Sequence, residues 1–106
     1  MLRKHAWADE EVAHELNDLV FLGKPELLYS NYTDKFYLSI PNVDIKDYLD
    51  DSVLTSICAH RDTKKEAVLD YSKRIKGAGV VIINAWGINR LAYKWDGEQF
   101  LEVHED

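Results

Sequence analysis

Apolar side chains in the N-terminal part of the chain recur every three or four residues over positions 12–20. Residues at this spacing share one face of a helix, so the pattern predicts an amphipathic helix. Gly23 and Pro25 follow, and glycine and proline in this order are typical of a helix end. We therefore expect a helix over residues 9–22, with Asp9 as its N-cap.

A second helix is predicted by a capping pattern. Thr63 is followed three residues later by Glu66, as in a capping box, where the hydroxyl satisfies an amide of the first turn and the carboxylate reaches back to the cap. Apolar residues continue on one face as far as Ile75, and Gly77 favours termination. The expected helix covers residues 63–76.

Strand-forming residues predict two antiparallel units. Residues 27–40 are rich in aromatic and aliphatic side chains around a polar centre, which indicates a hairpin, and Pro41 ends it because proline cannot donate a ladder hydrogen bond. Residues 80–83 form a continuous apolar run typical of a central strand buried on both faces. Residues 91–95 then alternate, so we expect a C-terminal meander over residues 79–103.

The turn at Asp96-Gly97 permits two registers of the last hairpin. A two-residue loop would set Leu91 opposite Glu102. A three-residue loop, with Gly97 in a bulge, would instead place opposite charges together on one face and apolar residues together on the other. The pairs it gives are Lys94 with Glu98, Arg90 with Glu102, and Leu91 with Leu101. We expect the bulged register.

The segment 42–60 has the least regular pattern. Ile45 and its neighbours suit one or two helical turns, and residues 52–58 fit either a short helix capped by Ser52 or a buried strand. We expect short helices. In the strand alternative, the chain would pass through the following helix into another strand and form a βαβ unit with a parallel pair.

These elements together predict an α+β fold. We expect a single two-layer domain over residues 1–106, because a chain of this length supports one hydrophobic core. A mainly antiparallel sheet, made of the hairpin 27–40 and the meander 79–103, would pack against the two helices. Residues 1–7 and 104–106 are expected to fray.

Composition changes this picture little. Hydrophobic residues make up 46% of the chain and charged residues 30%, which is ordinary for a globular protein. The first residues lack the apolar run of a secretory signal, and no segment has the 18 or so apolar residues of a membrane span. A single cysteine, Cys58, excludes an internal disulfide. We therefore expect a cytoplasmic protein with no membrane association.

The net charge of −6 is unevenly distributed. Residues 1–51 hold five basic against eleven acidic side chains, whereas residues 61–76 hold six basic against three acidic ones. Overall acidity opposes general nucleic-acid binding, since phosphate contacts require a basic surface. It leaves room for one small anion site.

Residues with metal or catalytic chemistry are present but not in diagnostic spacing. The histidines are His5, His14, His60 and His104. They form no zinc motif, and the aspartates of residues 44–51 lack the glycine and closing glutamate of a calcium loop. Cys58 and His60 lie two residues apart without an oxyanion motif, so Cys58 is expected to be a small buried hydrophobe. We expect no metal, no cofactor and no catalytic residue.

One alternative is a small enzyme or a phosphate-binding regulator. Free amides at the start of the second helix, together with the helix dipole, favour anions. The side chains that would assist are His60, Arg61, Lys64 and Lys65. Two acidic residues, Asp62 and Glu66, lie at the same end and oppose this site.

The favoured interpretation is a binding module that docks on a protein. An acidic stripe on the first helix and aromatic residues near turns are typical of an interaction surface. The residues expected to contact a partner are Glu11, Glu15, Asp18, Tyr32, Trp86 and Asn89. The chain would inhibit a macromolecule such as a nucleic-acid-handling enzyme, as small acidic proteins of phages and mobile elements do. A further alternative is an oligomeric structural subunit that pairs through a sheet edge near residues 100–103.

Overall fold

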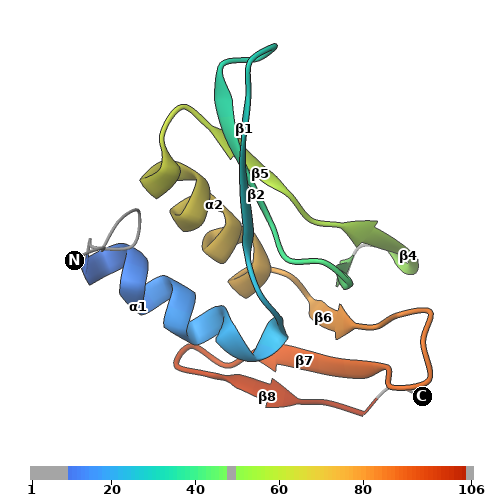
Figure 1. The fold of residues 1–106 in the computed structure, drawn as a ribbon. Coiled ribbons are helices and arrows are strands. Elements are labelled where there is room, and N and C mark those ends of the chain that lie inside the picture. Colours follow the sequence, from blue (N-terminus) through green and yellow to red (C-terminus); the bar gives the residue numbers. More distant parts are fainter. Residues whose placement is uncertain (1–9, 48–49, 105–106) are drawn as a thin grey trace.

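The computed structural model describes residues 10–47 and 50–104. The elements, in chain order, are α1 (Glu10–Leu19), the 3-10 helix η1 (Val20–Leu22), β1 (Glu26–Ser30), β2 (Lys35–Ser39), β3 (Val43–Asp47), β4 (Asp50–Ser56), β5 (Ala59–Arg61), α2 (Lys64–Lys76), β6 (Val80–Ile83), β7 (Leu91–Trp95) and β8 (Phe100–Glu102). They form the expected α+β domain (Figure 1). None of the described helices is both long enough and apolar enough to cross a membrane.

The strands form two antiparallel sheets, whereas the sequence pattern predicted one. The first sheet has the order β1-β2-β5, and the second has the order β4-β3-β6-β7-β8. The predicted hairpin and the predicted meander are both present, but they belong to different sheets. The chain leaves the first sheet after β2, turns through Pro41 and through Asn42 at φ 65°, and enters the second sheet as β3. The amide of Asn84 donates to the carbonyl of Asn42 over 2.9 Å and fixes this crossing.

α2 packs on β2 and β5 of the first sheet, α1 packs against α2, and the β1–β2 hairpin projects beyond the helices (Figure 1). Tyr71 of α2 lies fully buried at the centre of the core, where burial raises the pKa of its phenol. Contacts between α1 and α2 join Glu11 to Lys65 near the helix starts and Asp18 to Lys76 near the ends. The two helices therefore run in the same direction.

The predicted end of the first helix and both predicted ends of the second helix are confirmed. Helical structure ends at Leu22, and Gly23 follows at φ 143°. Thr63 caps α2, since its hydroxyl accepts from the Glu66 amide over 3.1 Å and donates to the Glu66 carboxylate over 2.8 Å. The predicted cap Asp9 lies outside the described residues.

The prediction of short helices within 42–60 is wrong. Residues 43–47 and 50–56 form β3 and β4, and β3 is hydrogen-bonded to strands on both sides. Val43 is buried opposite Ile83, and Ile45 packs against the core opposite Val81. The strand alternative is also only partly right, because β5 and β6 flank α2 in different sheets and make no parallel pair.

The predicted register of the last hairpin is wrong as well. Trp95 faces Phe100, Lys94 faces Leu101, and Tyr93 faces Glu102, so a four-residue loop joins the strands. The Asp96 carboxylate accepts from the amides of Glu98 and Gln99, each over 2.8 Å. These amide bonds lower the pKa of Asp96 and favour the longer turn. In this register Lys94 is not opposite Glu98 and Glu102 is opposite Tyr93 and not Arg90, whose guanidinium donates to the Ala85 carbonyl.

Two glycines at positive φ provide a matched test of the fold. A Cβ at Gly23 would lie 3.0 Å from Ile40 Cγ2, whereas a Cβ at Gly97 would meet nothing within 4 Å. Both Gly→Ala substitutions add backbone strain of about 1–2 kcal/mol. We expect G23A to lower the free energy of unfolding by about 1 kcal/mol more than G97A, because it also crowds the core. Urea unfolding of both variants checks this, and equal losses would contradict the packing at Gly23.

Candidate functional site

The acidic stripe of α1 is directed toward α2. Glu15 lies 2.9 Å and Asp18 lies 2.8 Å from the ammonium of Lys76, and Glu11 lies 3.3 Å from that of Lys65. These carboxylates already form intramolecular ion pairs. A partner that used them would compete with α2.

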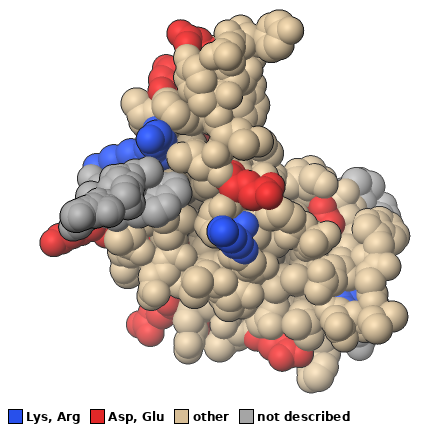
Figure 2. Space-filling view, viewed as in Figure 1, with Lys and Arg blue, Asp and Glu red and all other residues tan. Residues whose placement is uncertain are grey.

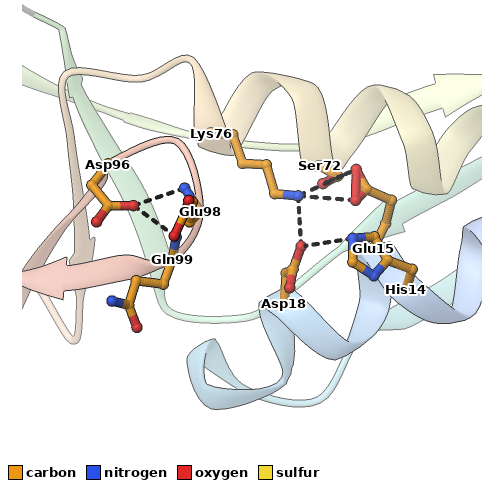
Figure 3. A network of polar contacts seen from close by, with 8 residues as sticks. All are labelled: His14, Glu15, Asp18, Ser72, Lys76, Asp96, Glu98 and Gln99. Atoms are coloured by element: carbon orange, nitrogen blue, oxygen red, sulfur yellow. Dashed lines mark hydrogen bonds and ion pairs between the residues drawn. The ribbon is translucent and has the colours of Figure 1, made fainter.

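Lys76 is the centre of this network (Figure 3). Its side chain is 16% exposed and also lies over the ring of Trp95, with the ammonium 4.4 Å from the centroid. Ser72, fully buried, donates to Glu15 over 3.1 Å. Burial acts to lower the pKa of Lys76, but the hydrogen bonds to Asp18 and Glu15 outweigh it and raise that pKa above its ordinary value. Three parts of the chain, α1, α2 and β7, therefore meet on one charged group.

The same network contains the described residues best placed to hold a metal ion. One ligand atom from each of His14, Glu15 and Asp18 lies within 4.8 Å of the others. Lys76, however, contacts both carboxylates at hydrogen-bonding distance. An ion would have to displace this ammonium group, so the arrangement is that of an internal ion pair.

The four residues of the predicted anion site all have internal partners. The His60 ring stacks on Tyr37 with 5.5 Å between centroids, and Arg61 pairs with Asp70 over 3.1 Å. Lys64 lies over the Phe36 ring and Lys65 pairs with Glu11. The fold brings the four residues to one end of α2 and engages their side chains there.

The loop between β6 and β7 presents two large apolar side chains to solvent. Trp86 is 88% exposed and Ile88 is 100% exposed. The loop backbone is nevertheless held in place: Gly87 donates to the Asn84 carbonyl over 2.9 Å, and the Arg90 guanidinium donates to the Ala85 carbonyl over 3.0 Å. Asn84 has φ 55°, a conformation that asparagine tolerates better than most residues. Trp86 and Ile88 are thus displayed on an ordered turn.

Two hollows border this loop at the junction of the two sheets. One has a volume of about 380 Å³ and lies between the β2–β3 connection and residues 84–89. The other has a volume of about 430 Å³ and reaches across to Ser56 and Cys58. Both are lined by Asn42, Asp44 and Trp86, so we treat them together as the junction cleft.

The chemistry of the junction cleft is polar but without positive charge. Ser56 donates to the Asp44 carboxylate over 3.0 Å, and no lysine or arginine lines the cleft in the described part of the chain. Cys58 is exposed at its rim, so the prediction that this thiol is buried is wrong. His60 stacks on Tyr37 and does not line the cleft, so its imidazole is not the base that would activate the Cys58 thiol there.

Tyr32 lies apart from Trp86, fully exposed at the tip of the projecting hairpin. A third hollow of about 520 Å³ runs along this hairpin and shares Ser39 and Cys58 with the junction cleft. On the face seen in Figure 2 the projecting arm carries few charges. Asn89 is exposed in the Trp86 loop, so two of the predicted partner residues lie together and Tyr32 lies at a distance.

No protein-family model, curated protein or solved structure matches the chain, so the site is interpreted from its own geometry. Sequence reasoning identified Trp86 and Asn89 but missed Ile88, Asn42 and Asp44. The sequence did indicate that Ile88 is exposed, because an aliphatic residue between a glycine and an asparagine lies in a turn and is seldom buried in the core. Asn42 and Asp44 come close to Trp86 only because the chain passes from β2 in the first sheet to β3 in the second at this point.

Lys76 is expected to contribute far more to stability than an exposed lysine in an ion pair. Lys76→Met would leave Glu15 and Asp18 without their cation and should lower the free energy of unfolding by about 2 kcal/mol, which is less than the roughly 3–5 kcal/mol for a fully buried pair because these side chains are still 16–21% exposed. Lys35 pairs with Asp62 over 2.9 Å on the surface, so Lys35→Met should cause little change. Chemical unfolding compares the two, and equal effects would contradict the assigned role of Lys76.

The contribution of Lys76 should also depend on pH in one direction. A group whose pKa is raised by folding stabilises the fold fully below its unfolded pKa, about 10.4 for lysine, and loses this effect as pH rises through the folded value. The difference in unfolding free energy between wild type and Lys76→Met should be constant from about pH 7 to about pH 9 and shrink above that. A difference that grows at alkaline pH would be inconsistent with the raised pKa.

Proposed function

We propose that the protein is a binding module whose contact surface is the Trp86–Ile88 turn together with the junction cleft. The exposure of these two large apolar side chains on a hydrogen-bonded turn carries the proposal. Tryptophan is among the residues most enriched at the energetic centres of protein interfaces. A protein partner that covers the turn would remove both side chains from water.

The geometry favours binding in two further ways. Because the backbone of the turn is already ordered, little conformational entropy is lost when a partner docks. The amide and carboxylate groups of Asn42, Asp44 and Asn89 lie beside Trp86 and offer hydrogen bonds around an apolar centre. This combination of an aromatic anchor and a polar surround is the usual composition of an interface.

The finer form of the proposal is an inhibitor, acting in the cytoplasm on a nucleic-acid-handling enzyme. The net charge of −6 supports it, since an acidic protein is steered toward the basic surfaces that such enzymes use for phosphates. In this form the acidic residues contribute mainly through their long-range field, because Glu15 and Asp18 are paired with Lys76. The association rate should then fall steeply with salt.

Substitution of Trp86 tests the proposed surface directly. In affinity capture from the native host, Trp86→Ala should lose at least about 90% of a specifically recovered partner, because a central anchor contributes roughly 2 kcal/mol or more. Val20→Ala provides the control, since Val20 is a 65% exposed apolar residue of η1 outside both hollows. Recovery of the same proteins in the same amounts by wild type and Trp86→Ala would reject the proposal.

A further inference from the structure

The outer edge of β1 has the features of a strand that pairs with another strand. β1 forms one edge of the three-stranded sheet, and its five residues pair with β2 in a continuous register from Glu26 to Ser30. No described strand lies on its other side. Natural edge strands are usually protected by lysines, prolines, bulges or a short length. Within β1, Glu26 is the sole charged residue and no bulge interrupts the pairing.

The two other sheet edges with described side chains along their whole length, β8 and β5, are less suited to pairing. β8 has three residues, and one of them is the charged Glu102. β5 is equally short and ends in Arg61, which is engaged with Asp70. β1 is longer than either and lies on the hairpin that projects beyond the helices (Figure 1).

The sequence of β1 is complementary to itself in the antiparallel direction. With Leu28 opposite Leu28 of a second copy, Leu27 faces Tyr29 and Glu26 faces Ser30. Apolar residues therefore meet apolar residues, and each carboxylate meets a hydroxyl that can donate to it. No like charges face each other in this register.

We propose that two copies of the chain pair through β1, centred on Leu28, and merge their first sheets into one antiparallel sheet of six strands. Leu28 is 66% exposed and Tyr29 is half exposed, so pairing would bury apolar surface and also satisfy the outward backbone groups of β1. Leu28 also lines the hollow beside Tyr32. The Trp86 turn belongs to the second sheet and takes no part in this pairing, so the proposal is independent of the proposed function.

Sedimentation equilibrium of the whole chain from about 1 μM to about 1 mM tests the pairing. Wild type should show a monomer–dimer equilibrium. Leu28→Arg should weaken the dimer at least about 100-fold, because two leucines per dimer lose their burial and two like charges face each other. Leu101→Arg is the matched control, since Leu101 is a 46% exposed leucine on the β8 edge. This variant should dimerise as wild type does.

A cross-linking experiment keeps the test independent of the folding of the arginine variant. In a Cys58→Ser background, which removes the native thiol, Leu28→Cys should form a disulfide-linked dimer under mild oxidation because facing Cβ atoms lie about 5 Å apart. Leu101→Cys should not. A wild type that is monomeric throughout, or a dimer lost with Leu101→Arg and kept with Leu28→Arg, would overturn the proposal.

Discussion

The ion pairing of Lys76 is the constraint on which the arrangement of the helices depends. Two helices that run in the same direction bring their negative C-terminal ends together, and here that end also carries Glu15 and Asp18. A cation at the last residue of α2 offsets this repulsion. By lying over the Trp95 ring, the same cation attaches both helices to β7. Lys76, a residue type that is usually found at the surface, thereby joins α1, α2 and the second sheet.

Local chemistry accounts for the parts of the fold that the sequence predicted. The Gly23 helix end, the Thr63 cap and the Pro41 strand end each depend on a few neighbouring residues. The predictions that were wrong concern segments whose structure depends on residues far away in the sequence. Residues 43–47 became a strand because β6, nearly 40 positions later, supplies a hydrogen-bonding neighbour. The four-residue turn at Asp96 forms in place of the predicted bulged turn because the Asp96 carboxylate accepts hydrogen bonds from two amides of its own loop.

The candidate site was predictable to a similar extent. The place of Trp86 in a turn rich in glycine and asparagine was predictable, whereas its exposure is known from the structure alone. The junction cleft was not predictable, because it exists where β2 passes into β3 against the β6–β7 loop. For the acidic stripe the sequence was misleading. The carboxylates on this helical face appeared available to a partner, but Lys76, which lies 58 positions from Asp18 in the sequence, forms an ion pair with Asp18. The proposed contact surface is consequently the uncharged aromatic turn and not the charged helix.

The central claim is that Glu15 and Asp18 of the acidic stripe belong to an internal, structural ion-pair network around Lys76. Nuclear magnetic resonance of Lys76 tests it most directly, because a methylene held over an aromatic ring is shifted upfield by the ring current. The structure predicts upfield Hε resonances for Lys76, with nuclear Overhauser contacts to the Trp95 ring and to the side chain of Asp18. Random-coil shifts for Lys76, without nuclear Overhauser contacts to either residue, would contradict this claim. The carboxylates of Glu15 and Asp18 would then be available to a binding partner.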